Sequence, residues 1–360
     1  MKPEAILAAA VELIRQIEAD NRPANEIINA YTRSRRYIGS KDRRDLTNLV
    51  WGYIRYHARL NYQYPHASLL EKLILIQKGE RPATVSGAPD YINWEVPEWL
   101  IPLIPNAARE LPALLGSAPV VLRANGSRDK IRQLLADDGI ETEPTKLSPY
   151  GLILTRRTNI QGHLLYQTGQ IEIQDEGSQC VALETGIKAD DTVLDYCAGA
   201  GGKSLIFAQM MANHGKIVAH DISDRSLSEL KKRALRAGAA CIQVQRPVQD
   251  FLFDHVVTDV PCSGTGTWRR CPDMRWKLTE KQFQTLLKTQ SEILDIAYRY
   301  VKPGGKLSYM TCSITEPENT QQIQNFLNRH TDFSLIRQRQ FSPILTGTDG
   351  LFIATLKRSE

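Results

Sequence analysis

The chain has 360 residues, of which 42% are hydrophobic and 24% are charged, and its net charge is +5. This composition is ordinary for a soluble globular protein that is long enough for two or three domains. Six cysteines, none of them in a CxxC pair, exclude a disulfide scaffold, so we expect reduced thiols in a cytoplasmic protein.

The N-terminal region is predicted to be helical. Residues 4–18 place apolar side chains on one helical face, whereas Glu12, Arg15 and Glu18 make the segment amphipathic. This pattern excludes a signal peptide, and no later apolar run approaches the roughly 18 residues that a membrane span needs. A second helix is expected over residues 43–60. A third helix is expected over residues 67–77.

Basic and aromatic residues are interleaved in residues 31–60, which hold eight Lys or Arg against two Asp. Such a helical segment suits a phosphate-binding face. It also suits a solvated helix face whose aromatic residues pack in the core, and from this stretch alone we favour that second interpretation. The aromatic residues are Tyr31, Tyr37, Trp51, Tyr53 and Tyr56.

The middle of the chain is predicted to hold a small module of mixed structure. Gly, Pro and polar residues in the segment 79–91 mark a loop or a boundary. Beyond it, a strand at 119–124, a helix at 127–137 and short strands near 151–155 and 171–173 indicate an α+β module.

From about residue 175 the pattern of a strand, a loop and a helix repeats. Strands that alternate with helices predict an α/β fold with a parallel sheet covered on both faces. The expected strands are 192–196, 216–220, 254–259, 306–312 and 351–358, with a weaker one near 241–245. The expected helices are 204–212, 224–237, 283–301 and 316–330. The second of these has Ser223 as N-cap and Gly238 as C-cap, and its expected core residues are Leu227, Leu230, Ala234 and Leu235.

A glycine-rich turn, CAGAGGKS, joins the first of these strands to its helix. Gly199, Gly201 and Gly202 let the backbone turn tightly and approach a ligand, and the helix N-terminus favours a polar or anionic group. Asp221 follows the next strand, where an acidic residue suits the hydroxyls of a ribose. A ribose without a pyrophosphate indicates S-adenosylmethionine. The alternative is a tight turn without a ligand, and the turn together with Asp221 favours the nucleoside cofactor.

Two cysteines follow strand ends. Asp259 ends one strand and Cys262 lies in the loop after it, whereas Cys312 ends another strand. Because parallel strands present functional groups at their carboxyl ends, both cysteines should face the cofactor. A thiolate that adds to carbon 6 of a pyrimidine makes carbon 5 nucleophilic enough to take a methyl group, so a cysteine beside a methyl donor suits this chemistry. The residues alone leave open which cysteine attacks.

The motifs together point to a family. The combination of DYCAGAGGKS, DVPCSGTG, RRCPDMRW, QSEIL, TCSITEPEN and GTDGLFIATLKR closely resembles the two-cysteine RNA cytosine-C5 methyltransferases, in particular the ribosomal RNA small-subunit methyltransferase B group (Sun/Fmu). The resemblance is strong over residues 175–358. Upstream, GSKDRRDLTNLVWGYIRY resembles the NusB-like RNA-binding domain of that group. The resemblance implies a class I methyltransferase fold, with a Rossmann-like sheet of seven strands, and S-adenosylmethionine as the cofactor.

The resemblance also implies roles for individual residues. Cys312 would be the nucleophile and Cys262 would help to release the product. Asp259 would lie beside the transferring methyl group and the target base, and Asp221 would hold the ribose. The cofactor loop would consist of Cys197, Ala198, Gly199, Ala200, Gly201, Gly202 and Lys203, with Asp259 completing the cofactor site.

Three features depart from the family pattern. The cofactor loop usually reads Cys-Ala-Ala-Pro-Gly-Gly-Lys, whereas this chain has Gly199 and Ala200 in place of Ala-Pro. The Asp that usually follows the third strand, where it meets the adenine, is missing, and Asp250 is a late candidate for its role. The helical N-terminal region is also shorter than the usual NusB-like domain.

The run TWRRCPDMRW carries basic residues beside two tryptophans, close to Cys262. We expect it to contact an RNA backbone and a stacked base, in preference to forming a surface loop with structural tryptophans. The target cytosine would be flipped out or single-stranded. The residues concerned are Trp268, Arg269, Arg270, Arg275, Trp276 and Lys277, whereas Cys271 has no predicted role.

Two further groups are not expected to take part in chemistry. Glu318 and Asn319 follow the strand that ends at Cys312, and we expect them to cap or brace the next helix. The seven histidines are scattered without metal-ligand spacing, so no metal site is predicted.

The sequence therefore predicts a helical, shortened NusB-like RNA-binding region (1–78), a connecting segment (79–118), a small α+β RNA-contact module (119–174) and a catalytic methyltransferase domain (175–360). The predicted function is methylation of cytosine carbon 5 in RNA, in the first place ribosomal RNA, by a monomer that binds neither metal nor membrane. The same chemistry on transfer RNA, and a non-catalytic RNA-binding factor in ribosome assembly, stay open as alternatives. A DNA cytosine methyltransferase would use the Pro-Cys cysteine as its nucleophile and leave Cys312 unexplained.

Overall fold

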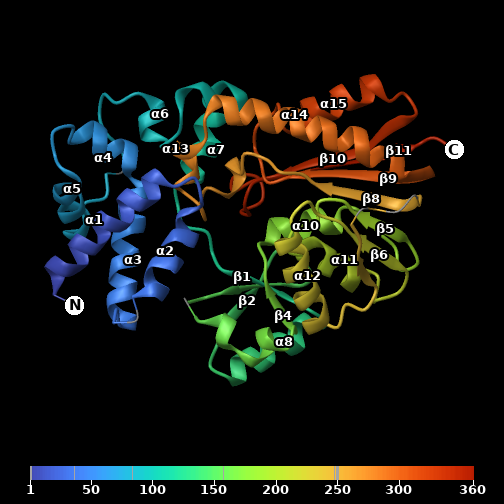
Figure 1. Ribbon diagram of the computed structural model, residues 1–360, viewed down its shortest axis with the longest axis horizontal. Helices are drawn as coiled ribbons and strands as arrows, with labels where there is room; N and C mark the ends of the chain where they lie inside the picture. Colours follow the sequence, from blue (N-terminus) through green and yellow to red (C-terminus); the bar gives the residue numbers. More distant parts are fainter. Residues whose placement is uncertain (1, 36, 83, 157, 247, 249–250) are drawn as a thin grey trace. The chain divides into compact units, whose positions relative to one another are not determined.

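The computed structural model describes the chain except for residues 1, 36, 83, 157, 247, 249 and 250 (Figure 1). The chain forms two compact units. Unit 1 comprises residues 1–117 and 267–282, and unit 2 comprises residues 118–266 and 283–360. Among the described residues, no helix is long and apolar enough to cross a membrane.

Unit 1 is built from helices. They are α1 (Pro3–Ala19), α2 (Ala24–Ser34), α3 (Ser40–Arg55), α4 (His57–Gln63), α5 (Leu69–Gln77), α6 (Asp90–Asn93), the 3-10 helix η1 (Glu98–Leu103), α7 (Ala107–Ala113) and α13 (Met274–Lys277). The apolar face expected for residues 4–18 is confirmed, because Leu13, Ile14 and Ile17 of α1 are fully buried in the core of the unit. The helix expected over residues 43–60 divides at Tyr56 into α3 and α4, and α2 is an additional helix.

Residues 267–282 belong to unit 1, although they lie far along the chain from the rest of it. Trp268 and Arg275 are almost completely buried, and the Arg275 guanidinium donates a hydrogen bond to the backbone at the end of α7. Trp276 stacks on His57 with the ring centroids 4.0 Å apart. The expectation that Trp268 and Arg275 contact RNA is therefore wrong, because both side chains are buried within their own unit.

Asp273 lies at the buried centre of this attachment. Its Oδ2 accepts the backbone N–H of Ala24 at 2.8 Å and lies 3.2 Å from the Lys277 ammonium. Ala24 is the first residue of α2, and the preceding residue, Pro23, has no side-chain group that could cap the helix. Asp273 thus supplies, from 249 residues along the chain, the cap that α2 lacks locally.

Unit 2 contains a small antiparallel sheet in the order β2-β3-β1-β4. Its strands are β1 (Val121–Ala124), β2 (Thr142–Pro144), β3 (Gly151–Leu154) and β4 (Ile171–Ile173). Helix α8 (Arg128–Asp137) packs on this sheet through Ile131 and Leu135, and the short helices η2 (Ile160–Gly162) and α9 (Leu164–Gln167) precede β4. The small antiparallel sheet with its helix is the α+β element that the sequence predicts here, with β2 as an addition.

The larger sheet of unit 2 has seven strands in the order β10-β11-β9-β8-β5-β6-β7. Strands β9, β8, β5, β6 and β7 run parallel to their neighbours in this group, whereas β11 and β10 are antiparallel. The bounds are β5 (Thr192–Asp195), β6 (Lys216–Ala219), β7 (Ile242–Val244), β8 (Phe253–Asp259), β9 (Val301–Thr311), β10 (Phe333–Phe341) and β11 (Leu351–Arg358). This arrangement confirms the expected α/β fold with a seven-stranded, Rossmann-like sheet.

Helices cover both faces of the larger sheet, as Figure 1 shows. One face carries α10 (Glu176–Leu183), α11 (Gly202–Met210) and α12 (Asp224–Arg236), and the other carries α14 (Glu280–Ala297) and α15 (Thr320–Arg329). Because successive side chains of a strand point to opposite faces, Val193 packs in the first core and its neighbour Leu194 in the second. Loops occupy the edge of the sheet where the parallel strands end. The predicted site residues lie in these loops or in the adjoining ends of β8 and α11.

The structure differs from the sequence analysis in three details. Leu235, expected in the core, is 85% exposed because it lies one residue beyond the buried stripe of α12. Strand β10 was not indicated by the sequence, since the residues between its buried ends are mostly exposed. Residues 79–118, expected to be a connecting segment, form α6, η1 and α7 and belong almost entirely to unit 1.

Replacement of Asp273 by Ala is expected to lower the free energy of unfolding of unit 1 by about 2 kcal/mol, because the buried N–H of Ala24 loses its partner. All five tryptophans of the chain lie in unit 1, so urea unfolding followed by tryptophan fluorescence reports on this unit. Asp90→Ala, at an exposed position of the same unit, is the control and should change the free energy by less than about 0.5 kcal/mol. Equal effects of the two variants would contradict the capping role.

Candidate active site

The glycine-rich loop follows β5 and leads into α11. Gly199 and Gly201 have φ angles of 53° and 84°, which residues other than glycine rarely adopt. A Cβ atom on Gly201 would lie 2.6 Å from Leu230 Cγ, so α12 leaves no room for a side chain there. A Cβ atom on Gly199 would meet nothing within 4 Å. The loop therefore packs against α12 at Gly201 and presents open backbone at Gly199.

Asp221 closes this loop from the strand next to β5. Its Oδ2 accepts the Gly199 N–H at 2.8 Å, and its Oδ1 accepts the Ser223 N–H at 2.8 Å. Ser223 caps α12 as predicted, since its hydroxyl accepts the N–H of Ser226. Each carboxylate oxygen has a further lone pair, so Asp221 retains the capacity to accept hydrogen bonds from the hydroxyls of a ligand.

Asp195, the last residue of β5, is buried beneath the loop. Its Oδ2 accepts the Ser204 hydroxyl at 2.6 Å, whereas its Oδ1 has no hydrogen-bond partner among the described residues. Burial, opposed by the Ser204 hydrogen bond and reinforced by the charge of Asp259, raises the pKa of Asp195 to about 7. An unpaired buried acceptor beside open glycine backbone fits a ligand that carries hydrogen-bond donors, as S-adenosylmethionine does.

Lys203 and Asp259 form an ion pair between α11 and the end of β8. Lys203 Nζ and Asp259 Oδ2 are 2.5 Å apart. Burial by itself would lower the pKa of Lys203, but the charge and hydrogen bond of Asp259, with a smaller contribution from Cys312, raise it above its usual value. The lysine therefore stays a cation, in a position to stabilise negative charge at Cys312.

The two cysteines expected at strand ends lie in contact. Their Sγ atoms are 3.1 Å apart, and the backbone N–H of Cys312 donates to Cys262 Sγ at 3.2 Å. The hydrogen bond with Cys312, burial and the nearby charge of Glu318 hold the pKa of the Cys262 thiol well above its usual value. At neutral pH Cys262 therefore carries its proton and is able to donate it in a hydrogen bond to Cys312. None of the six cysteines forms a disulfide.

A buried carboxylate holds the two cysteine loops together. Glu318 Oε1 accepts the Ser263 N–H at 2.8 Å, and Oε2 accepts the hydroxyls of Ser263 and Ser313, each at 2.5 Å. Ser263 follows Cys262 in the chain, and Ser313 follows Cys312. A threonine hydroxyl and a glutamine amide complete the set of donors. Because a carboxylate removed from water needs its hydrogen bonds, these contacts fix both loops at once.

Glu318 and Asn319 thus differ from the role expected for them. Asn319 occupies the N-cap position of α15 without a capping hydrogen bond, and its side chain instead binds Thr311, the Ser313 carbonyl and Gln340. Both residues brace the loop after β9, not the helix. The signal in the sequence was the hydroxyl residue after each cysteine, since buried hydroxyls need an acceptor.

Unit 2 thus contains the residues predicted for catalysis and for the cofactor loop. Within it, Cys262 contacts Cys312 and Lys203 contacts Asp259. Asp221 contacts the cofactor loop. Asp250, the late candidate for the adenine, lies outside the described residues. Among the residues that the structure describes, no cluster of His, Cys, Asp and Glu could hold a metal ion.

The chain is similar to known proteins of one family. The family model described as 16S rRNA methyltransferase RsmB/F matches residues 180–357. The ribosomal RNA small subunit methyltransferase B of Photorhabdus laumondii is 34% identical over 285 residues, which are 73% of this chain and 66% of the relative. The probable ribosomal RNA small subunit methyltransferase B of Bacillus subtilis is 32% identical over 307 residues, which are 77% of this chain and 68% of the relative. The chain therefore spans about two thirds of the length of these curated relatives.

The fold also has a solved counterpart. The crystal structure of PH0851 matches with a TM-score of 0.83 and covers 99% of each chain. Its sequence identity of 22% shows a shared fold alone.

Replacement of Glu318 by Gln is expected to lower the free energy of unfolding by about 3 kcal/mol, because an amide has a single acceptor oxygen and turns its own hydrogens toward the surrounding donors. Glu316→Gln, the same change at an exposed position nearby, is the matched control and should cost less than about 0.5 kcal/mol. Urea unfolding followed by far-UV circular dichroism measures both variants, since unit 2 contains no tryptophan. Equal stability of the two variants would show that the carboxylate does not hold the cysteine loops.

Proposed function

Because the chain belongs to the 16S rRNA methyltransferase RsmB/F family, we propose that it methylates carbon 5 of a cytosine in ribosomal RNA through a covalent bond between Cys312 and the base. S-adenosylmethionine is the cofactor of this family. The observation that supports the proposal is the pair of sulfur atoms 3.1 Å apart, with the Lys203–Asp259 ion pair beside them. Two thiols in contact at neighbouring strand ends suit a reaction in which a carbon–sulfur bond is made and later broken.

The proposed mechanism begins by making carbon 5 nucleophilic. The Cys312 thiolate adds to carbon 6, the double bond between carbons 5 and 6 opens, and electron density moves to carbon 5. When bound, S-adenosylmethionine supplies the methyl group that carbon 5 attacks. The proton of carbon 5 then leaves to a nearby base. The double bond re-forms and the carbon–sulfur bond breaks, which returns Cys312 as a thiolate.

The charges around the two sulfurs support different roles for them. The Lys203 ammonium contributes a positive charge near Cys312, where it is suited to stabilise the charge that develops on this sulfur as the carbon–sulfur bond breaks. Cys262 keeps its proton, so it is suited to donate a hydrogen bond to the sulfur of Cys312 as that sulfur leaves carbon 6. We therefore assign nucleophilic attack to Cys312 and product release to Cys262. Asp259, oriented by Lys203, is assigned to the neighbourhood of the target base and the methyl group.

The cofactor is proposed to lie along the glycine-rich loop. Open backbone at Gly199 would face it, and Asp221 would accept hydrogen bonds from its ribose. Burial and the charge of Asp195 raise the pKa of Cys197, so this third cysteine is a neutral part of the wall and not a nucleophile. The proposed cofactor residues are Cys197, Ala198, Gly199, Ala200, Gly201, Gly202, Lys203, Asp221 and Asp259.

RNA binding is proposed for surfaces outside the two-cysteine site. In residues 31–60, Tyr31 and Tyr53 are buried, whereas Tyr37 is 73% exposed. Basic side chains are also exposed around the connection between α2 and α3, namely Arg33, Lys41 and Arg44. The segment therefore combines core aromatic residues with a basic surface, which supports an RNA-binding role for the helical region. We extend that role to the small α+β module and propose that the protein acts as a monomer.

Two variants test this function directly. The wild type, Cys312→Ala and Cys262→Ala are incubated with methyl-labelled S-adenosylmethionine and unmodified 16S rRNA. The wild type should label cytosine, and Cys312→Ala should lose about a thousandfold or more of this activity because the nucleophile is gone. Cys262→Ala should accumulate a covalent protein–RNA complex on denaturing gels, because the leaving sulfur loses its hydrogen-bond donor.

The controls separate the alternatives. A Cys262→Ala/Cys312→Ala double variant should form no covalent complex, and accumulation of the complex by Cys312→Ala instead would invert the two roles. Labelling of transfer RNA in place of 16S rRNA would move the substrate to transfer RNA. A wild type that binds RNA but neither binds the cofactor nor transfers methyl groups would favour the non-catalytic assembly factor, in keeping with the unusual Gly199 and Ala200.

A further inference from the structure

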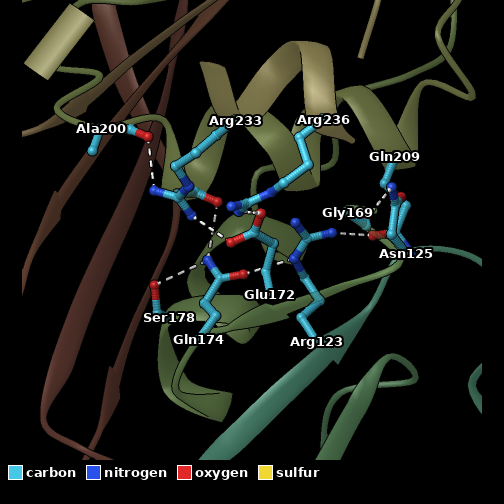
Figure 2. A network of polar contacts seen from close by, with 11 residues as sticks. Arg123, Asn125, Gly169, Glu172, Gln174, Ser178, Ala200, Gln209, Arg233 and Arg236 are labelled. Carbon is cyan, nitrogen blue, oxygen red and sulfur yellow. Dashed lines mark hydrogen bonds and ion pairs between the residues drawn. The ribbon is translucent and has the colours of Figure 1, made fainter. Parts of the chain in front are cut away.

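The guanidinium of Arg233, on α12, reaches the cofactor loop. Its Nη1 donates to the Ala200 carbonyl at 2.7 Å and its Nη2 donates to Glu172 Oε2 at 3.0 Å. Figure 2 marks both contacts. Ala200 lies between Gly199 and Gly201, which both have positive φ angles. One side chain thus ties the part of the loop with the greatest intrinsic backbone freedom to a carboxylate on β4.

Glu172 is held firmly in its own position. It is 2% exposed, and its Oε1 lies 2.5 Å from Arg236 Nη2 while its Oε2 binds Arg233. Arg236 also lies over the ring of Tyr166, 4.5 Å from the centroid. Because both oxygens carry a charged partner, the carboxylate is unable to rotate without losing an ion pair. It therefore presents an acceptor of defined position to Arg233.

The turn before β4 lies directly against the end of α12. A Cβ atom on Gly169 would lie 2.3 Å from the carbonyl oxygen of Arg236, so only glycine permits this approach. The Asn125 amide, at the end of β1, donates to the Gly169 carbonyl at 3.1 Å (Figure 2). It also donates to the Ala237 carbonyl at 3.0 Å. The small sheet and α12 are thus joined by backbone contacts as well as by ion pairs.

A second side chain from the same part of the chain holds the other end of the loop. Gln174 Nε2, next to β4, donates to the Gly202 carbonyl at 3.1 Å, and its Oε1 accepts from Arg123 Nε at 2.8 Å. Arg123 is buried on β1 and also donates to Gln209 of α11. Two carbonyl groups, those of Ala200 and Gly202, are therefore bound by side chains that the small sheet orients.

We propose that Arg233 is a positioning residue for the cofactor loop, and that the small sheet of β1 to β4 orients it through Glu172. The inference rests on the proposed function, because it takes this loop as the S-adenosylmethionine site. A loop with glycines at positions 199 and 201 and no proline loses more conformational entropy when it orders around a ligand. Hydrogen bonds that hold Ala200 before the ligand arrives remove part of that loss, and they strengthen binding without touching the ligand. The small sheet thus has a second role beside the RNA contact proposed for it.

The test compares Arg233→Lys with Arg236→Lys. Both arginines pair with Glu172, but among the contacts of the pair only that of Arg233 reaches the loop carbonyl. A lysine keeps the charge opposite Glu172 but lacks the fork that binds a carboxylate and a carbonyl together. Calorimetry with S-adenosylmethionine should show a Kd about tenfold higher for Arg233→Lys, equivalent to about 1.4 kcal/mol, and a change of less than about twofold for Arg236→Lys.

Kinetics on the full chain give a readout that a loss of folded protein would not mimic. For Arg233→Lys, KM for S-adenosylmethionine should rise about tenfold, while kcat at saturating cofactor stays within about twofold of the wild type. Glu172→Asp is a second variant. It keeps the negative charge, but the side chain is one methylene shorter, so the carboxylate lies farther from α12. Its Kd for S-adenosylmethionine should rise about threefold or more.

The outcomes separate this inference from the proposed function. A wild type that binds no S-adenosylmethionine overturns both. A wild type that binds, together with an unchanged Kd for Arg233→Lys or an equal change for Arg236→Lys, overturns the positioning role alone. A fall in kcat at an unchanged KM would also overturn it, because Arg233 would then act in the chemical step.

Discussion

The parallel pairing of β8 with β9 decides where the reactive groups of the site lie. Asp259 at the end of β8 pairs with Met310 of β9, and beyond these residues the two loops bring Cys262 and Cys312 into contact. A register shift by one residue would send the side chains of one strand to the opposite face of the sheet. Since helices cover both faces, the buried side chains on each face hold this register. The geometry of the two thiols is therefore a property of the whole sheet and not of either loop.

Carboxylates, two of them buried and one partly exposed, join segments of unit 2 that are distant in the sequence. Glu318 binds the loop of Ser263 from 55 residues away, Asp259 binds Lys203 from 56, and Glu172 binds Arg233 from 61. Removing a carboxylate from water is costly unless its hydrogen bonds are replaced, so an arrangement in which any of these pairs is broken is disfavoured strongly. Hydrophobic packing alone tolerates small shifts of one element along another. These charged contacts do not tolerate such shifts. They occur around the cofactor loop and the two cysteines, where sub-ångström positions matter most.

The sequence could predict the elements with strong periodicity and the groups placed at their ends. Most strands of the larger sheet, the glycine turn, Asp221 and the two strand-end cysteines follow from local patterns. Residues 267–282 could not be placed in the same way, because an arginine such as Arg275 is ordinarily a surface residue and its acceptors lie far away in the chain. Glu318 was misassigned for a related reason, since its position beside a helix start suggested a cap, whereas its partners lie in another loop. Contacts between distant segments leave little trace in a single sequence unless both partners belong to a known motif.

The contact between the thiols underlies the different roles that we propose for the two cysteines. Two thiolates 3.1 Å apart in a partly buried site would repel each other strongly, so the pair holds at least one proton. Cys262 keeps this proton, because the hydrogen bond with Cys312, desolvation and the nearby charge of Glu318 raise the pKa of its thiol well above the usual value. The proton that Cys262 retains then acts at two steps of the proposed reaction, the attack and the breaking of the carbon–sulfur bond. It stabilises Cys312 as a thiolate before attack and again when the carbon–sulfur bond breaks, so one hydrogen bond serves a nucleophile that must also be a good leaving group.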